Sequence, residues 1–378
     1  MILNKRILFL SGTRADFGKI KSLILKLNSN KMLDIYIFVT GMHLSKIHGS
    51  TYKEIEKLNL SNIEKFNNQD AKNRMDITLA NTIYGLNTYI NKNPIDLIIV
   101  HGDRIEALAG AIVGVLNNIL VAHIEGGELS GTVDDLIRHS VSKLSHLHLV
   151  SNISSKNRLL QLGENNENIY IIGSPDYDIM TSNKLPKLND VIDYYQIPFN
   201  DYAILLFHPV TTEIDFIEKQ ALCIIESLIE TNLNYLIIFP NNDSGSKKIL
   251  KIYKKFENFK NFKFYPSIKF ESFLTLLKNS NFIIGNSSAG IRESPFYNIP
   301  SINIGSRQDG RLKNNLIYNV PFNKDAIKKT IFKVNKLKIK TNDKFKHFGK
   351  KGSDEKLYKI ISTGKIWNIK IQKKFIDL

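Results

Sequence analysis

Ionisable side chains gather where short apolar runs of this 378-residue sequence end. The densest group, from His123 to His139, holds four carboxylates, two histidines and the pair Gly126-Gly127 within seventeen residues. Such groups are costly to place near the rim of a sheet unless they are paired or move protons. Carboxylates whose pKa values are pushed apart supply one acid and one base, as proton removal from carbon with departure of a leaving group requires. The segment therefore predicts a site of general acid–base chemistry.

Two other roles compete for this segment. The run Thr132-Val-Asp134-Asp135 is also an ordinary helix start, so at least one of the two aspartates could be an N-terminal cap. Metal binding is the other role, but His123 and His139 are too far apart to be two ligands on one helix, and the sequence has no H-E-x-x-H motif. We therefore expect no metal.

Anion binding is indicated further along the chain. An apolar run ends at Gly285, and Ser287 and Ser288 then open a predicted helix, so that backbone N–H groups and hydroxyls face an anion. Glu293, one to two turns on, can reach a ribose diol, and Arg307 follows the next apolar run with a guanidinium suited to phosphate. Ordinary N-capping by the serines is the alternative.

The first half of the chain also presents charged groups after apolar runs. Arg14, in Gly-Thr-Arg-Ala-Asp, stands beside a predicted helix start and either meets a phosphate or pairs with Asp16. The same segment lacks the spaced glycines of a dinucleotide fingerprint, so no nicotinamide cofactor is expected. His43, Asp103 and Arg104 follow the next two runs, although a histidine at such a position is often a satisfied structural residue.

Prolines restrain two polar segments of the second half. Pro209 follows His208, and Pro240 precedes Asn241-Asn242, in each case directly after an apolar run. Because proline fixes the backbone there, we expect His208 and Asn242 to point into the ligand site.

The elements that position these residues alternate between two patterns. Short apolar runs bounded by Gly, Asn and Asp alternate with longer stretches of helical period, which is typical of β-α units in a parallel sheet. We expect strands near residues 6–11, 35–40, 96–101, 120–124, 147–150 and 169–172, and a second series near 203–207, 235–239, 262–265, 282–284 and 301–304. Helices are expected near 19–27, 78–90, 105–116, 134–145 and 154–162, and then near 214–230, 246–256, 270–278 and 289–297.

The two series predict an α/β protein with two doubly wound, Rossmann-like domains, because the chain is also too long for one domain of usual size. We expect the domains to span residues 1–175 and 176–378, joined near Gly173–Asp178, and the second series of strands to begin after the polar, irregular stretch 174–198. Since such sheets bind ligands at the carboxyl ends of their strands, the active site is expected in the cleft between the domains.

The motifs above, in order from about residue 6 to residue 311, resemble those of the hydrolysing UDP-N-acetylglucosamine 2-epimerases. They are Gly12-Thr-Arg-Ala-Asp, Gly41-Met-His, His101-Gly-Asp-Arg, His123-Ile-Glu-Gly-Gly-Glu, Asp134-Asp-Leu-Ile-Arg-His, His208-Pro-Val-Thr-Thr, Gly285-Asn-Ser-Ser and Gly305-Ser-Arg-Gln-Asp-Gly-Arg. The resemblance implies a GT-B arrangement of two Rossmann-like domains, UDP held mainly by the second, and no cofactor. It also implies anti elimination of UDP to a 2-acetamido-glycal, to which water adds, so that UDP-GlcNAc and water give ManNAc and UDP.

The resemblance assigns roles residue by residue. Its catalytic acid–base groups fall on Asp103, Glu128, Asp134 and His208. Its nucleotide contacts fall on Arg14, Asn242, Ser287, Ser288, Glu293 and Arg307, and we add His43 and Arg104 as substrate ligands because they stand at the same strand ends.

Two departures separate this sequence from the non-hydrolysing epimerases. Those enzymes resemble it at Gly-Thr-Arg but continue with Pro-Glu where Ala15-Asp16 stands, and they carry alanine at the position of Gly126. Hydrolysis is therefore favoured over a non-hydrolysing epimerase, and a GT-B glycosyltransferase is a further alternative. The motifs serve uridine, phosphates and C2, so they leave open UDP-GlcNAc for sialic acid or the 2,4-diacetamido-2,4,6-trideoxy analogue for legionaminic acid.

The charge of the chain is concentrated at its end. Its 52 Lys and Arg exceed its 36 Asp and Glu by a formal +16, and residues 311–378 hold 19 of the basic residues and 5 of the acidic ones. These are almost all lysines on predicted solvated helical faces, without an arginine–aromatic platform for bases, so we expect no nucleic-acid partner. The alternative is a polyanion or membrane-surface contact, with the cleft acting as a sugar-nucleotide sensor.

Other sequence features bear on the setting of the protein. No run approaches the roughly 18 to 20 apolar residues of a membrane-spanning helix, so no membrane insertion is expected. The single cysteine, Cys223, lies in an apolar helical run and is expected in the core. We expect a cytoplasmic homodimer or homotetramer.

Overall fold

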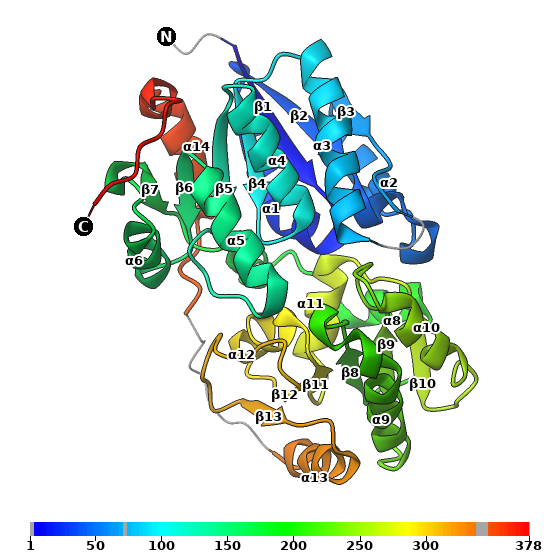
Figure 1. The fold of residues 1–378 in the computed structure, drawn as a ribbon. Coiled ribbons are helices and arrows are strands. Elements are labelled where there is room, and N and C mark those ends of the chain that lie inside the picture. The colour runs from blue at the N-terminus through cyan, green and yellow to red at the C-terminus, as the bar shows by residue number, and fades with distance from the viewer. Residues whose placement is uncertain (1–3, 71–73, 338–346, 378) are drawn as a thin grey trace. The chain divides into compact units, whose positions relative to one another are not determined.

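The computed structural model describes residues 4–70, 74–337 and 347–377, and these form two compact units. The first domain comprises Met1–Ser182 together with His347–Leu378, and the second domain is Asn183–Lys346. Each is a Rossmann-like α/β domain with a wholly parallel sheet, as expected (Figure 1). The predicted cleft between them concerns their relative placement and stays a prediction.

The sheet of the first domain has seven strands in the order β3-β2-β1-β4-β5-β6-β7. Its strands are β1 (Lys5–Ser11), β2 (Leu33–Val39), β3 (Asn62–Lys65), β4 (Leu97–His101), β5 (Leu120–Ile124), β6 (Leu147–Val150) and β7 (Ile169–Ile171). Its helices are α1 (Arg14–Asn28), α2 (Tyr52–Glu56), α3 (Met75–Lys92), α4 (Ile105–Leu116), α5 (Thr132–Leu144), α6 (Ile153–Gln161), α7 (Pro175–Met180) and α14 (Ser353–Ser362).

Alternation along the central strands divides the core of this domain into two layers. In β1, Ile7 and Phe9 pack with α1 on one face, whereas Leu8 and Leu10 pack with α3, α4 and α5 on the other. Both faces are therefore covered, which explains why the central strands are mostly apolar, with few residues of the alternating polar kind.

The second domain repeats this plan with six strands in the order β10-β9-β8-β11-β12-β13. Its strands are β8 (Ala203–Leu206), β9 (Tyr235–Ile238), β10 (Phe262–Tyr265), β11 (Ile283–Gly285), β12 (Ser301–Ile304) and β13 (Ile317–Val320). Its helices are α8 (Leu188–Tyr195), α9 (Ile217–Ile229), α10 (Ser246–Lys254), α11 (Phe270–Lys278), α12 (Glu293–Phe296) and α13 (Lys324–Asn335).

Several elements differ from the expectation. The structure adds β3 and β13, which are edge strands and so need no apolar run of the kind that identifies a central strand. The stretch 174–198, expected to be irregular, contains the short helices α7 and α8. The helix expected near 289–297 is a 3₁₀ turn (Ser288–Gly290) followed by the four-residue α12. Cys223 is half-buried against the core of the second domain.

The domain division also differs from the expected one at the C-terminus. Helix α14 packs on α1 of the first domain, where Leu357 and Ile361 join the same core layer as Ile7 and Phe9 (Figure 1). Asp178, in α7, accepts hydrogen bonds from the Ser353 backbone N–H (2.8 Å) and from the Gly352 backbone at the start of α14. The chain thus returns to its first domain because that sheet face needs the apolar side of α14 to cover it.

Candidate active site

The predicted residues of the first half meet at one edge of the first sheet. Strands β2, β1, β4 and β5 are neighbours and parallel, so the segments that follow them share the carboxyl edge. These segments carry Arg14, His43, Asp103, Arg104 and Glu128, and α5, which carries Asp134, begins beside them. The acid–base cluster predicted from sequence is therefore assembled within the first domain.

Asp103, which follows β4, is held by groups from α5 and from the loop before it. Ser130 Oγ donates to Asp103 Oδ2 (2.5 Å), and the Arg138 guanidinium donates to the same oxygen. Arg138 is 1% exposed, and its Nε and Nη1 also donate to Ser130 Oγ (2.9 Å) and to the Glu125 carbonyl (2.7 Å). This buried arginine fixes both the Asp103 carboxylate and the turn after β5.

Glu125 is a further buried carboxylate of the cluster, and sequence reasoning did not select it as catalytic. It directly follows β5, is 3% exposed and has a left-handed φ of 66°, which is uncommon for a residue other than glycine. Its Oε1 lies 3.4 Å from His101 Nε2 and 3.6 Å from Lys19 Nζ, and Ser174 Oγ donates to it (3.2 Å). Its position immediately after a strand and before two glycines was the available signal.

The remaining carboxylates of this segment divide between two roles. Asp135 accepts a hydrogen bond from the Ser130 backbone N–H (2.7 Å) and lies 3.5 Å from His139, so it supports the start of α5. Asp134, beside it in the first turn, is half-buried, and Glu128 is almost fully buried at the end of the turn. The N-cap of α5 is Gly131 and no side chain caps the helix, so the capping alternative is wrong for both aspartates. Asp134 stays a candidate for chemistry.

The histidines of the first domain are mostly structural. His123 donates or accepts at both ring nitrogens, with Ser142 Oγ (3.0 Å) and the Gly102 carbonyl (2.8 Å), and burial lowers its pKa to about 3. His43 is fully buried between Ser11 Oγ (2.9 Å) and Thr51 Oγ1 (2.7 Å). This geometry favours a positioning role for His43 over the predicted contact with substrate.

Arginines at this edge have acidic partners. Arg14 pairs with Glu54 rather than with Asp16, the partner considered from sequence. Arg104 Nε lies 3.3 Å from Glu106 Oε2. Both guanidinium groups are thus held in place at the carboxyl edge of the sheet.

Asp16 organises the turn that presents Arg14. Its carboxylate accepts from the Gly12 and Thr13 backbone N–H groups (both 3.0 Å) and from Ser11 Oγ (2.5 Å), and Thr13 completes a capping box. Burial acts to raise the pKa of Asp16, but the nearby His43 ring and the hydrogen bonds from Ser11 and the Gly12 amide outweigh it, so the pKa lies below its ordinary value.

Replacing Asp16 with Ala is expected to destabilise the first domain by about 1 to 2 kcal/mol near neutral pH, because a cap and its buried partners are lost. The stabilisation by a carboxylate with a depressed pKa is present above its unfolded-state value and is lost as the pH falls through the folded-state value. Urea unfolding should therefore show a gap between wild type and variant that narrows below about pH 4. Asp325→Ala, at an exposed position, serves as the control, and a gap that does not narrow contradicts the assignment.

In the second domain, hydrogen bonds fix both the backbone and the ring of His208. The backbone of His208 donates to Asn286 Oδ1 (2.7 Å) and accepts from Asn286 Nδ2 (2.8 Å). The Asn241 backbone N–H donates to His208 Nδ1 (3.0 Å). Because Nδ1 accepts, the neutral ring carries its proton on Nε2, which makes Nε2–H the donor that His208 can offer a ligand.

The turn after β11 has the form expected of an anion site. Gly285 has a φ of 129°, and a Cβ there would stand 2.1 Å from the Leu206 carbonyl oxygen, so glycine is required where the two strands approach. Ser287 and Ser288 follow at a half-buried position, and Ser287 Oγ accepts from the Ala289 backbone N–H (3.3 Å). Ser287 is thus an N-cap, as the alternative proposed, while Ser288 opens the 3₁₀ turn.

Polar groups from neighbouring segments surround this turn. Arg307 Nη1 (3.2 Å) and Gln308 Nε2 (2.9 Å) both donate to the Asn286 carbonyl oxygen, which links the turn after β12 to the turn after β11. Glu293, at the start of α12, is 3% exposed, and Asn242 follows β9 at a half-buried position. The edge therefore gathers a guanidinium, hydroxyls, an amide and an imidazole N–H, which together can bind a phosphate-bearing ligand.

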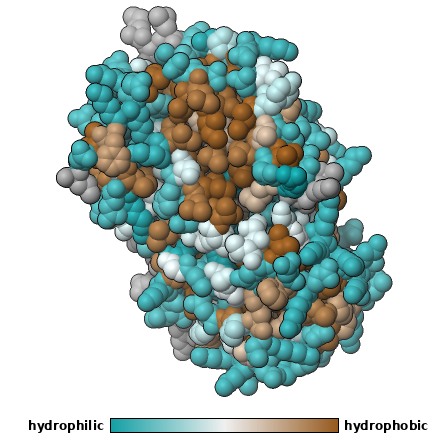
Figure 2. Space-filling model, viewed as in Figure 1, coloured by the Kyte–Doolittle hydropathy of each residue, from teal (hydrophilic) through white to brown (hydrophobic). Residues whose placement is uncertain are grey.

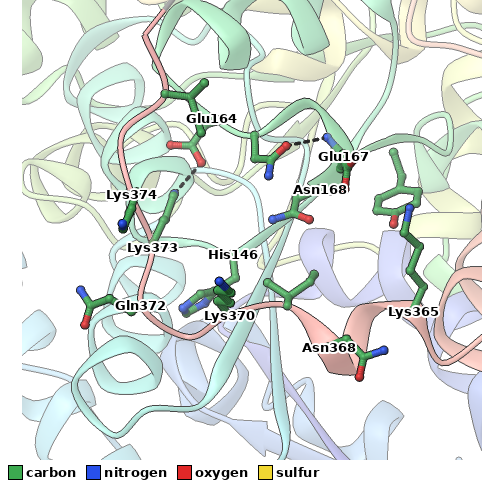
Figure 3. Close-up of a pocket in the computed structure, with 14 residues that line it drawn as sticks. His146, Glu164, Glu167, Asn168, Lys365, Asn368, Lys370, Gln372, Lys373 and Lys374 are labelled. Atoms are coloured by element: carbon green, nitrogen blue, oxygen red, sulfur yellow. Dashed lines mark hydrogen bonds and ion pairs between the residues drawn. The ribbon is translucent and has the colours of Figure 1, made fainter.

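A cavity of about 600 Å³ lies elsewhere in the first domain, at the amino ends of β6 and β7, where the C-terminal segment lines it (Figure 3). Figure 3 shows Lys373 directed at Glu164, which is buried and also lies 2.9 Å from His148 Nε2 and 3.2 Å from Lys143 Nζ. Lys373 further donates to the Ser145 carbonyl (2.7 Å). At least this lysine of the basic end is an internal anchor rather than a solvated charge.

Within residues 4–70, 74–337 and 347–377, no group of three His, Cys, Asp or Glu side chains is arranged to hold a metal ion. Over the same residues, the helices are all too short or too polar to cross a membrane.

Known proteins resemble this chain over nearly its whole length. A family model described as UDP-N-acetylglucosamine 2-epimerase matches residues 25–362. A UDP-N-acetylglucosamine 2-epimerase of Neisseria meningitidis serogroup B is 45% identical over 375 residues, 99% of either chain. A UDP-N,N'-diacetylbacillosamine 2-epimerase (hydrolyzing) of Legionella pneumophila is 32% identical over 365 residues, 95% of this chain and 96% of its own length.

Solved structures share the fold. The crystal structure of Methanocaldococcus jannaschii UDP-GlcNAc 2-epimerase in complex with UDP-GlcNAc and UDP has a TM-score of 0.78 to this chain, with 22% identity, 95% of this chain covered and 100% of the other. This likeness confirms the predicted fold class of two Rossmann-like domains of the GT-B type. Taken with the match to the family model, the 45% identity shows that the chain belongs to the UDP-N-acetylglucosamine 2-epimerase family.

Proposed function

We propose that this chain is a hydrolysing 2-epimerase that converts UDP-GlcNAc and water to ManNAc and UDP. The observation that carries the proposal is the buried cluster of Asp103, Glu125 and His101 around Arg138 and Lys19 at the carboxyl edge of the first sheet. Such a cluster can hold and release protons at fixed positions, which is what chemistry at C2 of the sugar needs. The Neisseria relative carries the same epimerase name.

The reaction proceeds in two steps in this proposal. A carboxylate of the first domain takes the proton from C2, the C1–O bond breaks, and its electron pair leaves on the β-phosphate of UDP. A C1=C2 double bond remains. Water then adds its hydroxyl to C1 while a second group delivers a proton to the opposite face of C2, which gives the free 2-epimeric sugar. Asp103, Glu128, Asp134 and His208 are the proposed acid–base groups, because one group cannot serve both faces of C2.

The diphosphate is assigned to the second domain. Arg307, Ser287, Ser288 and the Nε2–H of His208 provide donors for a dianionic leaving group, and Glu293 and Asn242 are proposed contacts to the ribose and uracil side. Arg14, His43 and Arg104 of the first domain complete the proposed set, with His43 acting through Ser11 and Thr51.

The hydrolysing branch is supported by the surroundings of Gly126. A Cβ at this position would stand 3.0 Å from both His123 Nδ1 and Ser142 Oγ, so the alanine of the non-hydrolysing pattern would press on a buried pair. The Legionella relative, whose name includes "(hydrolyzing)", adds support.

The proposal is tested by incubating the chain with UDP-GlcNAc in D₂O and following the mixture by NMR. We expect free ManNAc with deuterium at C2, together with one UDP per sugar. A sugar still attached to UDP would mean the non-hydrolysing reaction, and sugar transfer that needs an acceptor would mean a glycosyltransferase.

A second substrate is favoured by the name of the Legionella relative, a UDP-N,N'-diacetylbacillosamine 2-epimerase. The chemistry at C2 is the same for this 2,4-diacetamido-6-deoxy sugar, so only groups near C4 and C6 distinguish the two. Measuring kcat/KM for both UDP-sugars decides between them. In either case the free 2-acetamido sugar is a precursor for nonulosonic (sialic or legionaminic) acid synthesis, which we place in the cytoplasm.

We also propose that the chain forms at least a homodimer through α3, α4 and α5. Tyr84, Leu116 and Leu136 are 71%, 76% and 71% exposed, and Figure 2 shows a broad hydrophobic surface over α4 and α5. Helix α4 carries no lysine in a chain with a formal charge of +16, so two copies can meet there without like-charge repulsion.

Light scattering should give the mass of at least a dimer for wild type and that of a monomer for the double variant Leu116→Glu/Leu136→Glu. An unchanged mass for the variant would contradict this interface.

Replacing Arg307 with Ala is expected to raise KM and to weaken UDP binding by about tenfold, because one charge-assisted contact to phosphate is lost. Turnover should change less than about threefold, since the contact forms equally in the ground and transition states. Steady-state kinetics and calorimetry with UDP provide the measurement. Arg74→Ala, an exposed arginine paired with Asp76, is the matched control. A loss of turnover alone would contradict the phosphate assignment.

A further inference from the structure

Asp176 is a fully buried carboxylate that the proposed reaction does not use. It is the second residue of α7, a short helix that packs on α1, and it is 0% exposed. Its Oδ2 lies 3.4 Å from Lys19 Nζ of α1. Burying a carboxylate is costly in free energy unless a cation stands beside it, and even a buried ion pair adds little net stability. The pair of Asp176 and Lys19 is therefore better explained by a role in the site than by stability.

Lys19 connects Asp176 to the acid–base cluster. The same ammonium group lies 3.6 Å from Glu125 Oε1, and the Lys19 side chain is itself buried. One cation is thus shared by two buried carboxylates, one inside the cluster and one outside it. Moving or neutralising either carboxylate therefore changes the electrostatic stabilisation that the ammonium group gives to the other carboxylate.

Charged groups of both signs lie around Glu125. Three carboxylates, Asp103, Glu125 and Asp176, face two permanent cations, Lys19 and Arg138. His101 Nε2 stands 3.4 Å from Glu125 Oε1. The Glu125–His101 pair therefore lies beside the positive charges of Lys19 and Arg138, which act on any proton that the pair holds.

Other charged groups near α7 point elsewhere. Lys356, on the neighbouring α14, donates to the Ile172 carbonyl (3.0 Å). Asp178, on the same helix as Asp176, binds the backbone at the start of α14. Lys19 thus links α7 to the cluster.

We propose that Asp176 is a positioning residue of the acid–base site. Asp176 anchors Lys19, and its negative charge weakens the electrostatic effect of the Lys19 ammonium group on Glu125. The effect on catalysis rests on the proposed function. The electrostatic coupling of Asp176 to Glu125 through Lys19 does not depend on it. With Asp176 charged, the cluster holds its proton more firmly. Without that charge, Lys19 favours the deprotonated pair of Glu125 and His101.

The test is Asp176→Asn, which keeps the size of the side chain and removes its charge. We expect the pH–kcat profile to move down by about one pH unit, because a nearby negative charge has been lost. Turnover near neutral pH should fall about tenfold, and KM should change less than about twofold. An unchanged profile with unchanged turnover would overturn the proposal.

Asp178→Asn is the matched control on the same helix. It loses hydrogen bonds to the start of α14 and should lower the thermal midpoint of the first domain, while leaving the pH profile in place. If Asp176→Asn lowered the thermal midpoint without moving the pH–kcat profile, Asp176 would be a purely structural residue like Asp178.

A measurement without turnover separates this inference from the proposed function. In NMR spectra of the two proteins, the pH midpoint of the His101 ring signals should be lower in Asp176→Asn than in wild type. If wild type acts on neither UDP-sugar, the proposed function fails while this comparison still decides the coupling. Equal midpoints in the two proteins would overturn the coupling whatever the activity.

Discussion

Asp103→Asn is expected to lower turnover by about 10²-fold or more, the usual scale for a lost general acid or base. The amide keeps the size of the side chain and still accepts hydrogen bonds from Ser130 and Arg138, but it cannot take a proton. The affinity for UDP should stay within about threefold, because the proposed diphosphate site belongs to the second domain. Single-turnover release of UDP and calorimetry with UDP provide the two measurements.

Asp135→Asn is the control for this experiment, since Asp135 is a nearby carboxylate that supports α5 rather than the reaction. Its turnover should stay within about threefold of wild type. If Asp103→Asn kept wild-type turnover, Asp103 would be a structural partner of Arg138, and the base would have to be sought at Glu125 or Asp134. Supplying the 2-acetamido-glycal with UDP to each variant would then show which step is lost.

His208→Asn is expected to lower turnover by about 10²-fold for a different reason, the loss of a single donor. Asparagine Oδ1 takes nearly the place of His208 Nδ1, so the hydrogen bond from the Asn241 backbone N–H is retained. Only the Nε2–H, the group directed to the ligand in our proposal, disappears. Steady-state kinetics with the preferred UDP-sugar measure the effect.

His208→Gln is the complementary variant, because its amide nitrogen reaches the position of Nε2 but no atom replaces Nδ1. If Nε2–H is the working group, His208→Gln should retain more turnover than His208→Asn. The reverse order would mean that His208 serves by holding the backbone of Asn241, and that another group assists departure of UDP.

The central strands could be predicted from the sequence because both of their faces are buried. The runs of β4, β5 and β6 are apolar except for one histidine in each, and their ends agree with the expected ranges to within one residue. Edge strands have no such requirement. Asn-Ile-Glu-Lys in β3 and Ile-Tyr-Asn-Val in β13 were therefore not identified, since only the neighbouring strand makes them part of a sheet.

The site could be located from sequence, but its internal partners could not. Glu125 and Glu128 stand three residues apart on one glycine-rich turn, and nothing in their spacing tells which one contacts Lys19 and His101. In the structure Glu125, which has a left-handed φ, makes these contacts. Arg138 was overlooked for a similar reason, since a lone arginine on a helix is usually a surface residue.

The return of α14 to the first domain has a consequence for the order in which the protein can be made. The ribosome synthesises the complete second domain before it reaches α14, whereas the sheet face that binds Leu357 and Ile361 is made at the start. Domains fold largely as units during synthesis, so the second domain can fold while the nascent first domain still lacks its α14 cover. The first domain, although its sheet is synthesised first, is therefore the last to be completed, and until then it exposes the apolar surface that α14 will cover.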